Sequence, residues 1–413
     1  MKSIFALLGA ILLFSRLCAG EAVVVTLESV GDRVRAQNPQ LKSARLLIQE
    51  AVGRARDAGR LDNPTFESSY EAGPGLREST LDVGLAQAFP LTNRLGLQKE
   101  ISVLEIKAAE AEVDQMQLQL AASAREVVVS LLAARARRDL LRQQIAINQE
   151  FANYLQQASS KGEGSALDAG QARLESNKLT LELTQLAVDE ASLANQLRSL
   201  LGMAPREQIT VAGDLPEPRA LAPDHDRNDL PDHQMATIRE QAAGREVELE
   251  RARRVDDVEL GVFANSMKRE DDPVGLESDR MLGIKLSIPL PLWNRNQGAI
   301  DEAGARHQRR QLEARELSRN LMLENDCARE EMHKWRGLIT EINDKLLPLA
   351  AQQVTQAERA YRAGQTEIQT LLQAREQQLE LLIARLDALC QYHLARVRYP
   401  SVNQPSADSS HEN

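Results

Sequence analysis

The chain has 413 residues, of which 43% are hydrophobic and only 3% aromatic, and its 60 acidic and 50 basic residues give a formal charge of −10. An acidic chain with both signs interspersed argues against a nucleic-acid partner, because no net positive field would hold phosphate. Three cysteines exclude a disulfide scaffold. So few aromatic residues are typical of long packed helices rather than of a compact enzyme.

The first 20 residues have the pattern of a signal peptide. Lys2 gives a positive start, residues 4–14 are almost continuously apolar, and small residues follow at Ala19 and Gly20. The apolar run is shorter than the about 20 residues that a membrane-spanning helix needs. We therefore expect residues 1–20 to be removed on secretion; a buried N-terminal helix is the alternative.

The rest of the chain repeats itself at an offset of about 200 residues. Residues 89–94 resemble residues 290–295. Further on, Gly162 followed by the triplet Gln171-Ala172-Arg173 resembles Gly364 followed by Gln373-Ala374-Arg375. We therefore expect one repeat over 21–202 and a second over 230–399. Between them, the Pro-rich segment 203–229 reads as a connector, and the Ser-, Asn- and Pro-rich tail 400–413 is expected to be disordered.

Each repeat is predicted to contain a first helix, two strands, a long helix and a return helix. The first helices are expected at 27–59, broken at Asn38-Pro39, and at 231–254. The long helices are expected at 93–159 and 294–363, with a kink at Pro348, and the return helices at 166–201 and 367–398. Long helices of roughly 90–100 Å suit antiparallel packing, either around a channel or in a solvated coiled coil.

Four short segments alternate between apolar and polar residues, at 65–72, 80–89, 257–266 and 280–289. Such alternation predicts strands with one apolar face, and nine to eleven tilted residues are enough to cross a bilayer. Phe263 is out of step, because it falls on the polar face. Four strands cannot close a barrel, so a membrane location would require several chains to share one. A small soluble sheet buried on one face is the alternative.

Several segments carry a resemblance to a known family. They are residues 38–41, 63–64, 288–298 and 360–364. With the twofold repeat, they make residues 24–398 resemble the outer membrane efflux protein family, of which TolC is the type. The run from Ile288 to Gly298 is most similar to the outer membrane components of cobalt–zinc–cadmium type heavy-metal efflux systems.

The resemblance implies a mixed, mostly α fold. Two internal repeats of long antiparallel helices would form a periplasmic α-barrel, and four strands per chain would contribute to a trimeric, twelve-stranded membrane β-barrel. It implies a homotrimer in the cell outer membrane, with most of the chain in the periplasm. Its partners would be outer membrane lipid, a periplasmic adaptor protein and an inner-membrane RND-type pump.

The function that the resemblance implies is that of an outer membrane exit duct in a tripartite efflux system, which conducts heavy-metal cations passively. An outer membrane channel for drug efflux or for type I protein secretion is one alternative. A soluble periplasmic coiled-coil scaffold or adaptor is another.

The resemblance also places candidate site residues. Adaptors would dock at the two hairpin tips, formed by Lys161, Gly162, Glu163, Gly164, Gly364, Gln365 and Thr366. An acidic ring narrows the tunnel of the type member, but Thr370 and Gln373 stand at the matching positions here. Asp168 of the first repeat is therefore the remaining candidate for a constriction; an exposed Asp at a helix start is the alternative.

The strand-to-helix turns are a further group, comprising Pro90, Asn93, Arg94, Pro289, Pro291, Asn294 and Arg295. No phosphate-binding loop, His-Glu-x-x-His, Cys-x-x-Cys or nucleophile elbow occurs in the sequence. We therefore expect no enzymatic activity, no cofactor and no metal centre.

Overall fold

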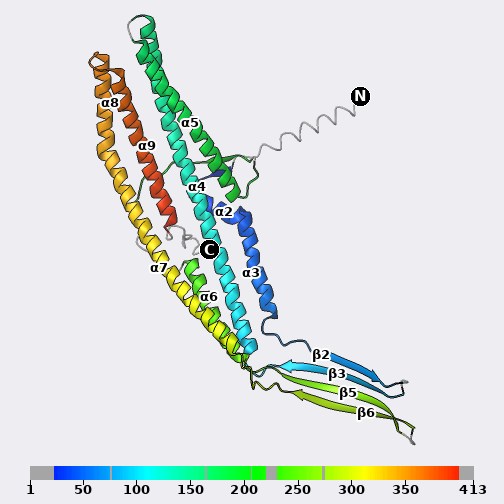
Figure 1. Ribbon diagram of the computed structural model, residues 1–413. Coiled ribbons are helices and arrows are strands. Elements are labelled where there is room, and N and C mark those ends of the chain that lie inside the picture. Colours follow the sequence, from blue (N-terminus) through cyan, green and yellow to red (C-terminus); the bar gives the residue numbers. More distant parts are fainter. Residues whose placement is uncertain are drawn as a thin grey trace, which may run out of the picture. The chain divides into compact units, whose positions relative to one another are not determined.

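The computed structural model describes residues 23–74, 77–162, 165–205, 207–219, 230–271 and 275–399. The expected signal peptide, the tail, residues 220–229 of the connector, and Glu163 and Gly164 of the first tip lie outside these ranges. The described part is mostly helical, with one four-stranded and one two-stranded sheet (Figure 1). The predicted mostly α fold with a pair of strands from each repeat is therefore confirmed.

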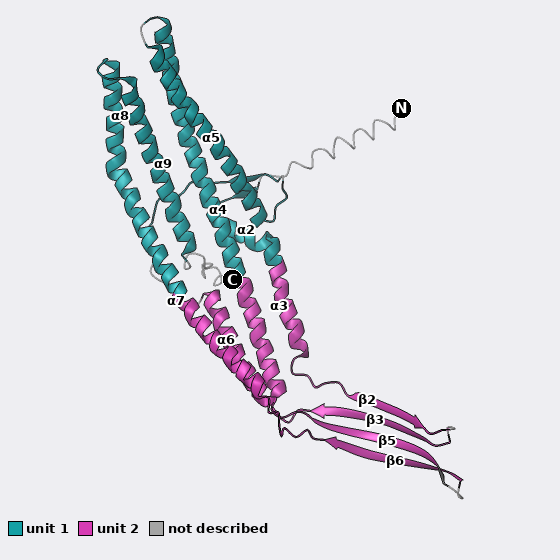
Figure 2. Ribbon diagram, viewed as in Figure 1, with its two compact units in different colours: residues 1–42, 115–226, 320–413 teal, residues 43–114, 227–319 magenta. Residues whose placement is uncertain are grey.

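The chain divides into two compact units (Figure 2). Unit 1 comprises residues 1–42, 115–226 and 320–413, and unit 2 comprises residues 43–114 and 227–319. Each unit contains segments of both sequence repeats, so the compact units are not the repeats themselves.

Unit 2 contains the long strands. β2 (Thr65–Ala72), β3 (Ser79–Phe89), β5 (Val258–Asp271) and β6 (Gly275–Ser287) form an antiparallel sheet in that order. The central pair, β3 and β5, joins the two repeats. β5 and β6 form a longer hairpin than the predicted 257–266 and 280–289. β6 ends before Pro289, because a proline has no N–H to donate to the ladder.

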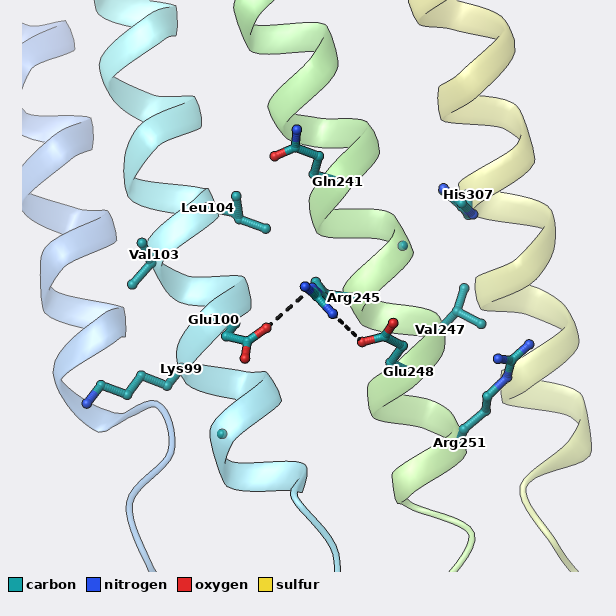
Figure 3. A pocket seen from close by; sticks show the side chains of 12 residues that line it. Lys99, Glu100, Val103, Leu104, Gln241, Arg245, Val247, Glu248, Arg251 and His307 are labelled. Carbon is teal, nitrogen blue, oxygen red and sulfur yellow. Dashed lines mark hydrogen bonds and ion pairs between the residues drawn. The ribbon is translucent and has the colours of Figure 1, made fainter.

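The helices of unit 2 are α6 (Pro231–Ala252) and parts of α3 (Pro39–Asp57), α4 (Arg94–Ser160) and α7 (Gln297–Glu341). Leu97 and Ile101 of α4 are buried against Leu249 of α6. Between these helices lies a cavity of about 1080 Å³, where Arg245 of α6 lies between Glu100 of α4 and Glu248 of its own helix (Figure 3).

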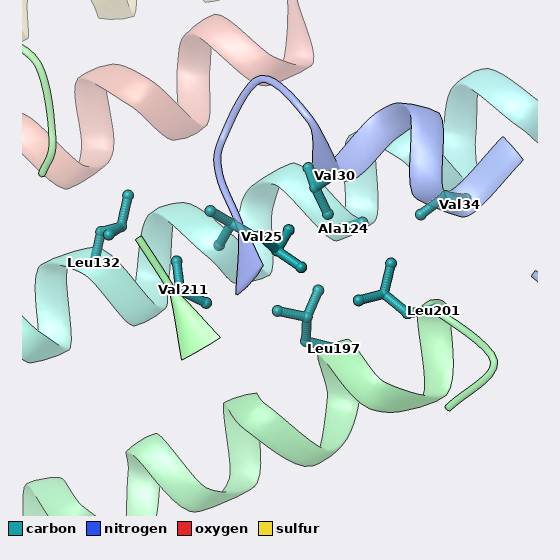
Figure 4. Close-up of a cluster of buried hydrophobic side chains, with 9 residues drawn as sticks. Val25, Val30, Val34, Ala124, Leu132, Leu197, Leu201 and Val211 are labelled. Atoms are coloured by element: carbon teal, nitrogen blue, oxygen red, sulfur yellow. The ribbon is translucent and has the colours of Figure 1, made fainter. Parts of the chain in front are cut away.

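Unit 1 contains α2 (Val30–Gln37), α5 (Ala166–Leu200), α8 (Leu347–Arg362), α9 (Ile368–Arg398) and the remaining parts of the long helices. Its core joins α2, α4 and α5 to a short parallel pair, β1 (Val23–Val25) and β4 (Ile209–Val211) (Figure 4). This pair was not predicted, because three residues are too few to show a period.

Two breaks in the predicted helices have local causes. At Asn38-Pro39 the side chain of Asn38 accepts a hydrogen bond from the backbone N–H of Leu41 at 3.0 Å, which caps α3 after α2 has ended. Near Pro348, a π-helical segment (Ile342–Leu346) separates α7 from α8. Pro348 has no N–H to donate to the carbonyl of Asp344, so the irregular turn falls where the sequence predicts a kink.

α7 begins at Gln297, three residues later than predicted, because Asn296 has a left-handed backbone with φ of 60°. No helix among the described residues is both long and apolar enough to span a membrane.

Candidate functional site

The four-stranded sheet has two chemically different faces. Residues paired across the strands point to the same face, so the row Phe66, Leu85, Val262 and Ile284 lies on one side. This apolar face is exposed to solvent in the single chain, with Leu282 87% and Ile284 75% accessible. The opposite face carries polar side chains, as the sequence alternation predicts.

The polar face is net negative. Asn265 donates a hydrogen bond to Asp82 at 2.6 Å, and Lys285 lies 3.5 Å from Glu259 and 3.9 Å from Glu67. By the strand register, the charged residues described on this face are six acids and two bases, namely Glu67, Glu71, Asp82, Glu259, Glu277, Asp279, Arg269 and Lys285.

Phe263, which interrupts the alternation of its strand, has a structural explanation. Its register partners are Gly84 on β3 and Gly283 on β6. An ideal Cβ at position 283 would lie 2.5 Å from the Phe263 ring, so the ring occupies the space that a side chain at Gly283 would need. The aromatic ring covers a glycine gap in the sheet, which sequence alternation alone does not reveal.

The sheet leaves two strand edges open. β2 pairs only with β3, and β6 pairs only with β5, among the residues described. Unpaired edges of this length invite pairing with another strand.

The first hairpin tip lies between α4 and α5. After α4, Gly162 has φ of 76° and its N–H donates to the Ser159 carbonyl at 3.0 Å. The chain re-enters a helix at Ser165, whose hydroxyl accepts hydrogen bonds from the N–H groups of Leu167 and Asp168. Lys161 and Gly162 are exposed at this turn.

The second tip, between α8 and α9, is built in a similar way. Gly364 has φ of 69°, its N–H donates to the Tyr361 carbonyl at 2.9 Å, and that of Gln365 donates to the Ala360 carbonyl at 2.9 Å. A Cβ added at Gly162 or Gly364 would meet nothing within 4 Å, so the left-handed backbone, and not crowding, requires glycine.

The two hairpins are joined close to their tips. The Tyr361 hydroxyl donates a hydrogen bond to Asp168 at 3.3 Å, and the Tyr361 ring meets Phe151 of α4 edge-on at 5.8 Å. The Arg375 guanidinium of α9 also contacts Phe151, and lies over its ring at 5.0 Å from the centroid. Burial, and then the nearby Asp168 carboxylate, raise the pKa of Tyr361, so it remains a donor.

The candidate constriction residues Asp168 and Thr370 have different surroundings. Asp168 is half-buried and accepts the hydrogen bond from Tyr361. Thr370 is exposed, and its hydroxyl interacts with that of Thr366 at 3.0 Å. Phe151 and Arg375 were not predicted as functional residues. The only signal for Arg375 was its position in the repeated Gln-Ala-Arg triplet.

The strand-to-helix turns differ between the repeats. Arg94 binds the Asp257 carboxylate through two donors, with Nε to Oδ1 at 2.9 Å, and both side chains are mostly buried. In the second repeat Asn294 accepts a hydrogen bond from the N–H of Asn296, whose own side chain donates to the Glu250 carbonyl and carboxylate. These turns border a polar cavity of about 620 Å³.

Pro90, Pro289 and Pro291 follow the ends of β3 and β6, and Asn93 begins α4 by accepting the Leu97 N–H at 3.1 Å. Arg295, which matches Arg94 in the repeat, is exposed. Within the described residues no group of three or more His, Cys, Asp or Glu side chains is placed to hold a metal ion.

Comparison with known proteins confirms the resemblance. Residues 226–398 match the family model described as outer membrane efflux protein. Over 400 residues, covering 92% of this chain and 90% of the relative, the sequence is 26% identical to the cobalt-zinc-cadmium resistance protein CzcC of Cupriavidus metallidurans.

Solved structures show the same fold. The outer-membrane channel OprN matches with a TM-score of 0.75 and 20% identity, covering 92% of this chain and 91% of that one. CusC matches with a TM-score of 0.76 and 17% identity, covering 91% of both chains. VceC of Vibrio cholerae matches with a TM-score of 0.72 and 18% identity, covering 91% of this chain and 95% of that one.

Proposed function

From the outer membrane efflux protein domain at residues 226–398, we propose that the chain is an outer membrane efflux channel, the exit duct of a tripartite system, and that it conducts heavy-metal cations. The observation that carries this proposal is the sheet, which has one apolar and one polar face and two open edges. β3, β5 and β6 have 11, 14 and 13 residues, enough to cross a bilayer when tilted.

The open edges support a homotrimer. A four-stranded sheet in lipid leaves unpaired backbone groups, and each such group costs several kcal/mol. Pairing β2 of one copy with β6 of the next would satisfy both edges, and three copies would close a barrel of about twelve strands.

The helices offer a second contact between copies. Four large apolar residues of α5 are exposed at a spacing of seven: Leu167, Leu174, Leu181 and Val188. A stripe of this period is typical of a helix seam that packs against another helix. A second group of exposed apolar residues, called here the α7–α8 stripe, consists of Leu338, Leu346 and Leu349.

The two stripes lie at matching levels. The hydrogen bond between Tyr361 and Asp168 places the end of α8 beside the start of α5. Leu181 and Leu346 then both lie about 24 Å along their helices from the tips. A rotation about a tunnel axis preserves these levels, so the α5 stripe of one copy would meet the α7–α8 stripe of the next in a closed ring.

Disulfide cross-linking tests this contact. In a Cys327→Ser background, Leu181→Cys combined with Leu346→Cys should give covalent dimers and trimers on oxidation. A matched control pairs Leu181→Cys with Leu323→Cys, which lies about 35 Å further from the tip and should leave single chains. Cross-linking of the control as readily as the test pair would contradict the packing.

Heavy-metal cations are the proposed substrate because of the relative CzcC and because the polar face of the sheet carries six acids and two bases. The proposed adaptor and RND-type pump partners rest on the family alone. The proposed docking tips are Lys161, Gly162, Glu163, Gly164, Gly364, Gln365 and Thr366.

The function is tested in a strain that lacks the gene. Loss should lower the tolerated concentrations of cobalt, zinc and cadmium salts and raise cell-associated metal, with both restored by the intact chain. A strain that becomes sensitive to hydrophobic drugs but not to metals would favour the drug-efflux alternative. A protein released from the periplasm without detergent would favour the soluble scaffold.

A further inference from the structure

An extended arm follows β6 and precedes α7. Residues 288–293 form no strand, and the N–H of Leu292 donates to the carbonyl of Leu290 at 2.8 Å in a tight turn around Pro291. The arm is apolar and highly exposed: Leu290 is 69%, Leu292 60% and Trp293 90% accessible. A tryptophan this exposed has almost all of its large apolar surface in water in the isolated chain.

The arm continues the apolar face of the sheet. Leu282, Ile284 and Leu286 lie on that face by register. The same spacing of apolar residues continues in the sequence at Ile288, Leu290 and Leu292, with the turn at Pro291 between the last two. Pro289 and Pro291 occupy the intervening positions, where they leave no N–H groups that would need a ladder partner. The apolar surface thus extends beyond the hydrogen-bonded strand.

Polar groups begin directly after Trp293. Asn294 borders the polar cavity that is also lined by Arg253 and Arg254, and Arg295 is exposed. An apolar run that ends in tryptophan and then in amide and guanidinium groups matches the change from acyl chains to phosphate headgroups across a bilayer interface. The first repeat has exposed Phe89 and Leu91 at the matching turn, but Thr92 in place of Trp293.

We propose that residues 288–293 are a lipid anchor that contacts phospholipid of the periplasmic leaflet, with Leu290 and Leu292 among the acyl chains and Trp293 at the level of the headgroups. The anchor rests on the proposed function, because it requires that the sheet lie in a membrane. A phospholipid surface is favoured over a second copy of the chain because the arm continues the lipid-facing side of the sheet, not one of its open edges.

Tryptophan fluorescence tests the anchor directly, since the chain has only Trp293 and Trp335. The variant Trp335→Phe leaves Trp293 as the only emitter, and the purified oligomer is reconstituted into phosphatidylcholine vesicles. We expect bromine atoms placed high on the acyl chains to reduce the emission by about half, and bromines near the chain ends to reduce it less, because tryptophan prefers the interface.

Trp293→Phe is the matched control. It leaves Trp335, which packs against the buried cluster of unit 1 that includes Met332 and Tyr392, and its emission should not respond to either brominated lipid. Blue-shifted emission from Trp293 without quenching would place the arm against protein and overturn the anchor. Emission typical of a tryptophan in water, measured on protein that floats with the vesicles, would overturn the anchor as well. Failure to float with vesicles would instead contradict the membrane location and the proposed function with it.

Discussion

The two repeats use equivalent residues in different ways. Arg94 is mostly buried and binds Asp257, whereas Arg295 at the matching turn is exposed. Arg375 is mostly buried over Phe151, whereas Arg173 in the matching triplet is exposed. Repetition of the chain therefore reproduces the layout of helices and strands, while the contacts that join the elements have specialised.

The largest effect is expected when a charge is placed on the apolar face of the sheet and not on its polar face. Ile284→Arg places a charge on the apolar face, which costs about 2–4 kcal/mol at the middle of a bilayer. We expect at least a tenfold loss of heat-stable oligomer in outer membrane extracts, measured by unheated gel electrophoresis. Lys285→Gln, one residue away on the polar face, is the control and should assemble normally. Equal assembly of both variants would contradict the assignment of the faces.

The second prediction compares the equivalent arginines of the turns. Arg94→Gln leaves the mostly buried Asp257 carboxylate without its main partner, which should cost roughly 1–3 kcal/mol of stability after allowance for partial exposure. Arg295→Gln should change stability by less than about 0.5 kcal/mol, because its side chain is exposed. The two variants are compared by thermal unfolding of the purified oligomers. Similar losses of stability would contradict the different roles of Arg94 and Arg295.

The third prediction concerns the contact between the hairpins. Arg375→Gln removes the guanidinium from the Phe151 ring, and a loss of about 0.5–2 kcal/mol is expected. Arg173→Gln in the first repeat is the matched control and should be nearly neutral. Faster proteolysis at the hairpin tips in Arg375→Gln, but not in Arg173→Gln, would show that stability is lost at the tips. Equal protection of both variants would argue against a contact that holds the hairpins together.

The smallest expected effect is a pH dependence in unit 1. Burial lowers the pKa of His393 from the ordinary value of 6.5, while the hydrogen bond to the Pro216 carbonyl partly opposes this shift. As the pH falls, the unfolded chain takes up a proton on His393 at a higher pH than the folded chain. The contribution of neutral His393 to stability is therefore complete above pH 6.5, and it is lost as the pH falls through the lowered native pKa.

His393→Gln should therefore flatten the fall in thermal stability below neutral pH, since an amide can still donate to Pro216 without titrating. His333→Gln, on an exposed part of α7, is the control and should retain the fall. An unchanged pH profile in His393→Gln would assign the effect to other groups.

Local patterns in the sequence predicted the features that depend on neighbouring residues in the chain. The alternation of the four strands predicted which residues share a face, and Pro348 predicted the irregular turn between α7 and α8. The tips were predicted at Gly162 and Gly364, which have the left-handed backbone that such turns use.

Contacts between distant segments were not predictable in this way. The ring of Phe263 over Gly283, the guanidinium of Arg375 over Phe151 and the pairing of Val23–Val25 with Ile209–Val211 each depend on tertiary packing. Nothing in the local pattern distinguishes Arg375 from Arg173. The left-handed Asn296, which delays the start of α7, is stabilised by the distant Glu250.

The native mass of the protein, extracted from outer membranes in mild detergent, tests the central claim most directly. We predict an assembly of three chains, because only shared strands can close the open edges of β2 and β6 in lipid. A monomer or dimer recovered without detergent would contradict the proposed channel. The apolar face of the sheet would then have to be covered by other protein.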